Sequence, residues 1–260
     1  MKDSKKAGQK FGQLIEILDE LRGVNGCPWD REQDERTIAD YFLEEVYESI
    51  EALYSQDYGW LAEELGDVMM EVVFLARIAK EKGEFTMSDV IDGINKKMIR
   101  RHPHVFGDKR IKNSARVWEA WNRQKQKEKK RGSLFDGIPK TTPSLLASFQ
   151  IGLRASSYGF DWEKSQDVLK KMKEEIAELE KAVQEKKEEE MTKEVGDVLF
   201  SLANLSRHLG VNPEIALSQA NKKFIQRFQF VEKKLKEEGK ELNQASLEEM
   251  DRIWEEAKKQ

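Results

Sequence analysis

A group of acidic residues occurs twice in this chain of 260 residues, with the same spacing in both copies. Each copy is a Glu-Glu-x-x-Glu segment followed by a Glu-x-x-Asp segment, and each residue of the second copy lies 130 positions after its counterpart. Acids three residues apart share one face of a helix, so two such helices side by side would direct four carboxylates at one place. Converging carboxylates repel one another unless a cation lies between them, and oxygen ligands suit Mg²⁺ or Mn²⁺. The candidate metal ligands are Glu45, Glu48, Glu64 and Asp67 in the first copy and Glu175, Glu178, Glu194 and Asp197 in the second.

The helical positions of these acids separate them from an ordinary solvated acidic surface, which is the commoner role of a Glu-rich helix. Glu64 and Asp67 share a stripe with Trp60, Glu71, Phe74 and Ile78. Glu45 and Glu48 likewise flank an apolar face. These stripes contain no Lys or Arg, and an unpaired buried ion costs several kcal/mol, so a metal ion is the simplest counter-charge. Gly66 and Gly196 lie between the paired acids, which suggests that another backbone or a ligand approaches there.

A basic pair also recurs in both halves of the chain. Lys97 and Arg101 are four residues apart, as are Lys223 and Arg227, and an Asn precedes each pair (Asn95 and Asn221). A single such pair is most simply a solvated basic stripe. Its recurrence beside a carboxylate group favours a polyphosphate site, in which a metal bridges phosphate oxygens and the cations neutralise developing charge. The chain has no Gly-x-x-x-x-Gly-Lys-Ser/Thr loop, which excludes a P-loop nucleotidase.

The elements that position these residues are predicted to be helices throughout, which makes the fold class all-α. The acidic helices are expected at residues 37–54, 59–82, 167–186 and 193–209. Further helices are expected at residues 10–23, 88–101 (with Ser88 as N-cap), 117–130, 145–155, 213–238 and 247–259. A segment with two Gly and two Pro, residues 132–143, separates the halves. We therefore predict tandem, duplicated four-helix-bundle-like domains at residues 1–132 and 145–260, joined by a linker at residues 133–144.

Composition excludes several classes of protein. A net charge of -4 argues against general nucleic-acid binding, which usually requires a basic excess. The most apolar stretch, residues 68–79, is interrupted by Glu71 and Arg77 and is too short to span a membrane. The N-terminal residues lack the apolar segment of a signal peptide. Cys27 is the only cysteine, so an intrachain disulfide is impossible, and we expect a cytoplasmic protein.

Taken together, these motifs resemble the MazG family of nucleoside triphosphate pyrophosphohydrolases, within the all-α NTP pyrophosphatase superfamily. The resemblance covers nearly the whole chain. Besides the two acidic groups, it depends on Gly26-Cys27-Pro28-Trp29-Asp30, Asp136-Gly137-Ile138-Pro139-Lys140, Gly159-Phe160-Asp161-Trp162, and Lys223-Phe224 with Arg227-Phe228. It implies a homodimer of tandem helical domains.

The resemblance also implies an activity, namely Mg²⁺-dependent cleavage of NTPs or dNTPs to NMP and pyrophosphate, with broad base specificity and a role in nucleotide pool clean-up or control. Mn²⁺ is a possible substitute for Mg²⁺. By the family pattern the second acidic group binds the metal, Lys223 and Arg227 bind the phosphates, and Trp254 and Lys258 line the nucleotide pocket, although Trp254 suits a core position equally well. Asn221, Lys97 and Arg101 complete the predicted nucleotide-binding set. Glu174 or Glu44 could take a proton from the attacking water.

Two other functions remain open from the sequence. A pyrophosphatase of one narrow substrate, such as dUTP or dCTP, would use the same metal site and differ only in its base pocket. A non-catalytic helical scaffold that binds nucleotides would show no turnover. The halves have also diverged, because Lys193 stands where the first copy has Glu63, and the sequence leaves open whether the N-terminal site is active.

Overall fold

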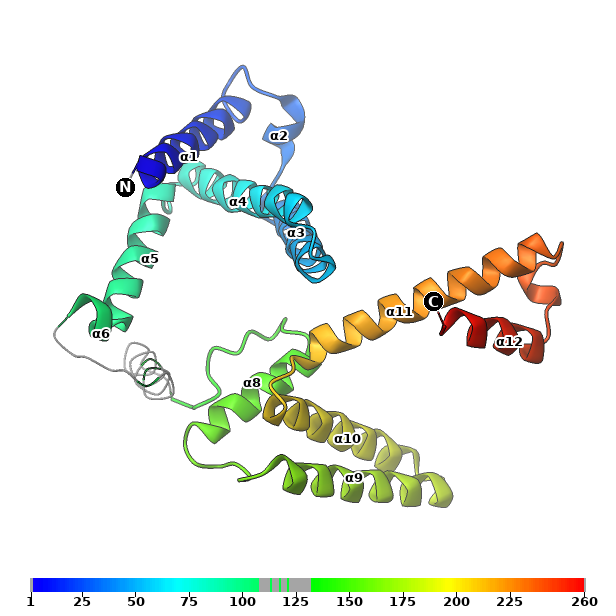
Figure 1. The fold of residues 1–260 in the computed structure, drawn as a ribbon. Helices are drawn as coiled ribbons and strands as arrows, with labels where there is room; N and C mark the ends of the chain where they lie inside the picture. Colours follow the sequence, from blue (N-terminus) through cyan, green and yellow to red (C-terminus); the bar gives the residue numbers. More distant parts are fainter. Residues whose placement is uncertain (1, 108–112, 114–116, 118–120, 122–131, 260) are drawn as a thin grey trace. The chain divides into compact units, whose positions relative to one another are not determined.

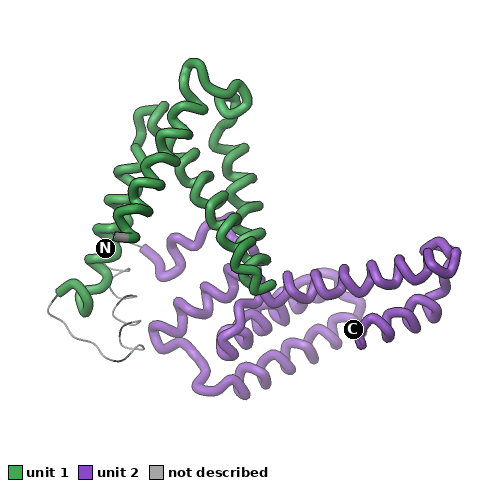
Figure 2. Tube along the Cα trace, turned by 45° about the horizontal axis from the view of Figure 1, so that its top comes forward, with its two compact units in different colours: residues 1–117 green, residues 118–260 purple. Residues whose placement is uncertain are grey.

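The chain folds into helices. The computed structural model describes residues 2–107, 113, 117, 121 and 132–259, and this part of the chain contains no strand. Two compact units, residues 1–117 (unit 1) and 118–260 (unit 2), divide it (Figure 2). The predicted all-α fold class with two tandem domains is therefore confirmed. Within the described residues, no helix has the length and apolar character that crossing a membrane requires.

Unit 1 is built on an antiparallel hairpin of two long helices, α3 and α4. Asp34 caps α3 by accepting hydrogen bonds from the backbone N–H groups of Arg36 and Thr37, and Asp57 caps α4 in the same way. Between them the chain reverses at Gln56, which adopts the left-handed conformation with φ 60°. The helices of unit 1 are α1 (Lys2–Leu21), α2 (Pro28–Glu32), α3 (Glu35–Ser55), α4 (Tyr58–Glu81), α5 (Met87–Arg101) and α6 (Pro103–Phe106) (Figure 1).

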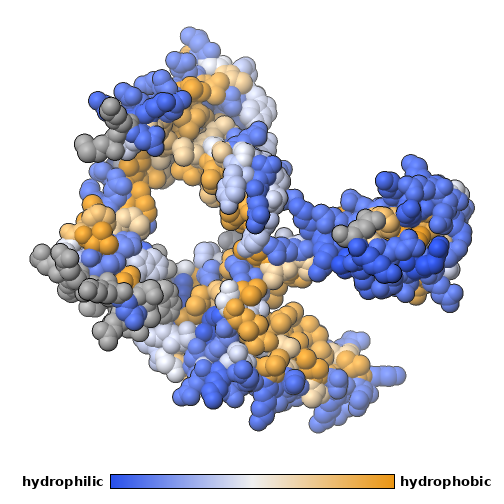
Figure 3. Space-filling model, in the orientation of Figure 1, coloured by the Kyte–Doolittle hydropathy of each residue, from blue (hydrophilic) through white to orange (hydrophobic). Residues whose placement is uncertain are grey.

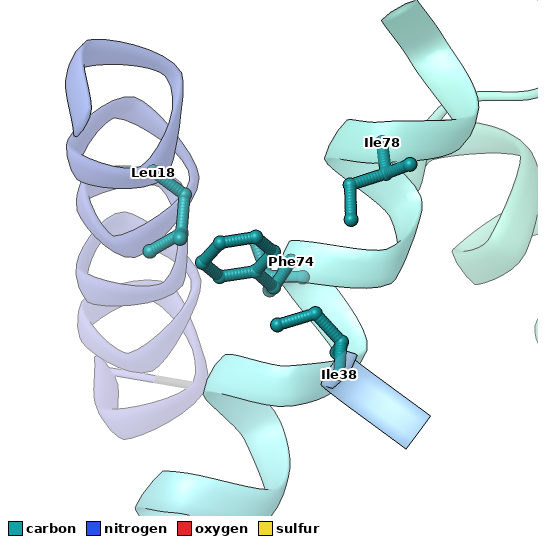
Figure 4. Close-up of a cluster of buried hydrophobic side chains, with 5 residues drawn as sticks. Leu18, Ile38, Phe74 and Ile78 are labelled. Carbon is teal, nitrogen blue, oxygen red and sulfur yellow. The ribbon is translucent and has the colours of Figure 1, made fainter. Parts of the chain in front are cut away.

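A small apolar core fixes the register of this hairpin. Leu18 of α1, Ile38 of α3, and Phe74 and Ile78 of α4 point toward one another, and each is at most 4 % exposed (Figure 4). Burying a side chain of this size stabilises the fold by about 1.5–3 kcal/mol. Because Phe74 lies two turns beyond Asp67 on α4, this core also determines where the first acidic group faces α3.

Unit 2 repeats the hairpin with α9 and α10. Its reversal is at Lys186, which has φ 55° and lies 130 positions after Gln56, so the two copies share their turn geometry as well as their acids. A second core, of Val231, Leu235 and Ile253, joins α11 to α12. The helices of unit 2 are α8 (Ser144–Ser156), α9 (Ser165–Glu185), α10 (Glu188–His208), α11 (Pro213–Glu237), the short 3₁₀ helix η1 (Leu242–Gln244) and α12 (Leu247–Ala257).

The loop before α9 is tied to the end of α10 by one carboxylate. Asp161 accepts hydrogen bonds from both terminal nitrogens of Arg207, at 2.9 and 2.5 Å, and contacts His208 Nε2 at 2.9 Å. Arg207 also donates to Asn204, and the absence of a side chain at Gly152 leaves room for both groups. The loop motif around Gly159 therefore positions α9 against α10.

Some helix ends differ from the sequence-based expectation. The N-cap of α5 is Thr86, whose side chain accepts a hydrogen bond from the Asp89 N–H, and the predicted cap Ser88 lies inside the helix. α10 begins at Glu188, earlier than the predicted residue 193. Nearly all of the helix predicted at residues 117–130 lies outside the described residues. The predicted domain boundary at residue 132 and the predicted linker at residues 133–144 stay predictions. Along the sequence, the boundary between the two compact units falls between residues 117 and 118.

Candidate active site

In unit 1 the hairpin brings three of the four predicted acids together. One carboxylate oxygen each of Glu45, Glu64 and Asp67 lies within 4.8 Å of the other two. Glu64 is only 6 % exposed, and Trp60 Nε1 donates a hydrogen bond to its Oε1 at 2.5 Å. Glu64 Oε2 is buried without a hydrogen-bond partner among the described residues. A buried carboxylate oxygen without a partner is costly, so this atom is suited to a cation.

The fourth predicted acid of unit 1, Glu48, is exposed but lies beside Glu64. Removal from water, together with the charge of Glu64, raises the pKa of Glu48 above its ordinary value. Burial and the neighbouring Asp67 raise the pKa of Glu45 more strongly, to about 7. Removal from water is the larger cause of both pKa shifts, and the neighbouring carboxylates add to it.

In unit 2 the equivalent residues also converge. Glu175, Glu194 and Asp197 each place a carboxylate oxygen within 4.8 Å of the other two. Glu175 and Glu194 are 8 % and 7 % exposed, and Glu194 Oε2 has no hydrogen-bond partner among the described residues. Glu178 lies on the exposed side of α9, outside this group of three. The structure therefore assembles the same three positions in both units.

The two clusters differ in their cations. Lys171 Nζ lies 2.8 Å from Glu175, and Lys193 Nζ lies 3.7 Å from Glu194. The sequence-based expectation of acidic stripes without Lys or Arg concerned the first copy, and it does not hold for the second copy. Lys171 could have been found from its spacing, since a Lys four residues before a Glu shares its helix face. Tyr41 is the residue of unit 1 that corresponds to Lys171.

The glycines between the acids do not accommodate another backbone within this chain. A Cβ placed on Gly66 or on Gly196 would meet no atom within 4 Å. The close approach of a backbone that the sequence suggested is therefore absent within the described part of the chain. Both positions open onto free space, which a ligand or a second molecule could occupy.

The donor set fits a hard divalent cation. Each cluster offers three carboxylates from two helices, one of which is buried with an unpartnered oxygen. Mg²⁺ and Mn²⁺ prefer such oxygen ligands and usually keep several waters. Glu45, Glu64 and Asp67 would hold the ion in unit 1, and Glu175, Glu194 and Asp197 would hold it in unit 2.

The predicted phosphate-binding residues of unit 2 gather in a separate pocket. This cavity of about 320 Å³ lies between α11 and α12 and is lined by Lys223, Gln226, Arg227, Phe230, Ala257 and Lys258. Arg227 lies over the Trp254 ring, 5.9 Å from its centroid, and the Phe224 ring is 5.0 Å from that of Trp254. Trp254 is half-buried and packs on the core of Val231, Leu235 and Ile253, and its predicted role in the nucleotide pocket stays a prediction. Gln226 and Phe230 had not been predicted.

Other predicted residues lie elsewhere. Asn221 is exposed on α11 and does not line the pocket. Glu174 is exposed, and its carboxylate lies 3.7 Å from Lys171 Nζ. In unit 1, Arg101 is buried whereas Lys97 is half-buried. The predicted role of each in nucleotide binding or catalysis stays a prediction.

The pocket and the carboxylates of unit 2 belong to different helix pairs. α12 packs on α11, whereas the acids lie on the α9–α10 hairpin (Figure 1). The lining of this pocket includes none of the clustered acids Glu175, Glu194 and Asp197.

Comparison with known proteins agrees with these motifs. The sequence model of the MazG nucleotide pyrophosphohydrolase domain matches residues 33–106 and 163–235, which contain both acidic groups. The nucleoside triphosphate pyrophosphohydrolase/pyrophosphatase MazG of Thermotoga maritima is 43 % identical over 254 residues, 98 % of each chain. The nucleoside triphosphate pyrophosphohydrolase of Escherichia coli K12 is 42 % identical over 261 residues, covering 96 % of this chain and 98 % of that protein. The uncharacterized protein YabN of Bacillus subtilis is 42 % identical over 261 residues, 99 % of this chain and 53 % of its own length. The chain belongs to the MazG nucleotide pyrophosphohydrolase family.

Proposed function

We propose that the chain hydrolyses NTPs and dNTPs to the monophosphate and pyrophosphate with Mg²⁺ held by Glu175, Glu194 and Asp197. The family match and the full-length relatives support nucleoside triphosphate pyrophosphohydrolase activity for this chain. Two observations on Glu194 carry the metal part of the proposal: its Oε2 is buried with no partner within the described chain, and its carboxylate converges with those of Glu175 and Asp197.

The remaining residues suit an in-line attack by water on a triphosphate. Mg²⁺ would supply charge neutralisation on the phosphate oxygens and make the attacking water more acidic. Lys223, Arg227 and Lys258 would bind the phosphates, and Arg227 has a fixed charge at any physiological pH. The water oxygen bonds to phosphorus, the bond to the pyrophosphate oxygen breaks, and a carboxylate takes the proton, for which Glu174 is the candidate.

Unit 2 is the unit that we propose to be catalytic. It contains both a carboxylate cluster and a basic pocket, and Lys258, directly after α12, lines that pocket. In unit 1, α5 ends at Arg101 and is followed by the short α6, so the described part of unit 1 has no helix that corresponds to α12.

Broad base specificity is also part of the proposal. Trp254 offers an aromatic face beside Arg227, and stacking on an aromatic ring accepts any base. We place the enzyme in the cytoplasm, where such substrates are made and where the single thiol of Cys27 stays reduced.

We further propose a homodimer, because the α9–α10 hairpin leaves apolar side chains uncovered. Leu199, Phe200 and Leu202 of α10 are 46, 42 and 41 % exposed, and hydrophobic surface is visible over α10 (Figure 3). Two hairpins of one kind form a four-helix bundle when they pack face to face, so a second copy is the partner that fits. A second copy could also bring its Arg227 pocket to these carboxylates, which the fold of one chain keeps apart.

One experiment tests the dimeric site. We would mix the Glu194→Gln variant, which lacks the metal site, with the Arg227→Ala variant, which has a weakened phosphate site, after partial denaturation and refolding, and assay ATP hydrolysis well below the KM of the wild type. If each site combines two copies, random pairing restores about a quarter of wild-type activity. An inactive mixture whose mixed dimers are verified by mass would mean that each chain builds its own site.

The function itself is tested by product analysis. We would incubate the protein with each of eight common NTPs and dNTPs and Mg²⁺, and identify the products by ion-exchange chromatography. The proposal predicts NMP and pyrophosphate from most of them, and no reaction in EDTA. Release of NDP and orthophosphate would contradict it. Glu194→Gln should abolish turnover, whereas Glu64→Gln, the matched change in unit 1, should leave most of it.

A further inference from the structure

Glu71 is a buried acid of α4 that the predicted metal-ligand set does not include. It is 4 % exposed, and its Oε2 has no hydrogen-bond partner among the described residues. It lies four residues after Asp67, so the two carboxylates share one helix face, and the charge of Asp67 acts on it. Three residues further on is Phe74 of the apolar core, so Glu71 lies between this core and the Glu45–Glu64–Asp67 cluster.

No basic side chain of the described residues pairs with Glu71. Arg22, directly after α1, and Arg77 of α4 are engaged elsewhere, because both bind Glu81, at 2.7 and 3.0 Å. A carboxylate in such a place costs several kcal/mol unless a cation compensates it. The charged form of Glu71 therefore needs a cation as its counter-charge.

Unit 2 lacks this acid, and it has a lysine beside its carboxylates at a different position. Ser201 corresponds to Glu71, and Lys171 corresponds to Tyr41. The site of unit 1 therefore contains an additional carboxylate and no lysine, whereas that of unit 2 has Lys171 and Lys193 against its acids. Unit 1 requires more positive charge from bound ions than unit 2 does.

We propose that Asp67 and Glu71 hold a second divalent cation, of the Mg²⁺ or Mn²⁺ class, which unit 1 binds and unit 2 does not. Two carboxylates with coordinated waters are an ordinary ligand set for such an ion. The ion would lie next to the one in the Glu45–Glu64–Asp67 cluster, deeper toward the core. The inference depends on the proposal that these clusters bind metal, but not on which unit is catalytic.

The test counts bound ions on the full chain. Electron paramagnetic resonance of Mn²⁺ at pH 8 reports the free ion, so a titration gives the number bound per chain at saturation. Glu71→Gln keeps the shape of the side chain and removes its charge, and Glu71→Ser installs the residue of unit 2. Both are expected to bind about one Mn²⁺ fewer than the wild type. The matched control in unit 2, Ser201→Ala, should bind as many as the wild type.

The outcomes separate this inference from the proposed function. If the wild type binds Mn²⁺ and both Glu71 variants, folded by circular dichroism, bind the same number at saturation, the second ion is refuted and the cluster sites stand. If the wild type binds no Mn²⁺ at all, the metal part of the proposed function fails with it.

Discussion

Metal binding to unit 1 should depend on pH because Glu45 must lose a proton to bind an ion. Its pKa is raised to about 7 by burial and by Asp67. From pH 8 to pH 6 the charged fraction of such a group falls about tenfold, so the apparent Kd for Mg²⁺ should weaken about tenfold. We would measure this by isothermal titration calorimetry of a Glu194→Gln variant, in which the cluster of unit 2 is impaired. An equal Kd at the two pH values would refute the reasoning.

The same shift determines how the stability of the metal-free protein changes with pH. A carboxyl whose pKa is higher in the folded than in the unfolded state stabilises the folded protein when it is protonated. Its contribution is fully present below its ordinary pKa of 4.5 and is lost as the pH rises through about 7. In EDTA the Tm should therefore fall between pH 5 and pH 8, and Mg²⁺ should restore it mainly at pH 8. Glu45→Gln is the control, since it removes the titrating group and should flatten both effects.

Three further predictions concern single contacts. Trp60→Phe removes the hydrogen bond to Glu64 and should weaken Mg²⁺ binding about 10-fold or more by calorimetry; an unchanged Kd would exclude an orienting role. Arg207→Met leaves Asp161 without its main partner and should lower the free energy of unfolding in urea by about 1–2 kcal/mol, whereas a loss below about 0.5 kcal/mol would contradict the role of this ion pair. Arg227→Ala should raise KM for ATP at least about tenfold with the fold intact, and an unchanged KM would remove it from the phosphate site.

The helices and their duplication could be predicted because they depend on local patterns. Apolar spacing located α3, α4, α9 and α10, and the shared 130-residue offset related the two hairpins. Single caps were harder, because Thr86 and Ser88 can each accept the same kind of hydrogen bond and only the chain's path into α5 decides between them.

The site was predictable within one helix and less so between helices. Glu64 and Asp67, or Glu194 and Asp197, are neighbours by spacing alone, and their convergence with α3 or α9 followed from pairing the acidic helices. The contact of Lys171 with Glu175 was not predicted, although their spacing allows it, because a lysine side chain has several possible positions on a helix face. The separation of the Arg227 pocket from the carboxylates depends on the direction of α11 relative to α10. Local sequence patterns do not predict this direction.

The central claim is that the carboxylate cluster of unit 2 holds the Mg²⁺ used to release pyrophosphate. Its most direct test is the rate of pyrophosphate release from ATP by wild type, Glu194→Gln and Glu189→Gln, an exposed acid on the same helix, at a series of Mg²⁺ concentrations. We predict Mg²⁺-dependent release by the wild type and Glu189→Gln, and a loss of at least about 100-fold in Glu194→Gln. Equal rates for all three proteins, or release that persists in EDTA, would contradict the account.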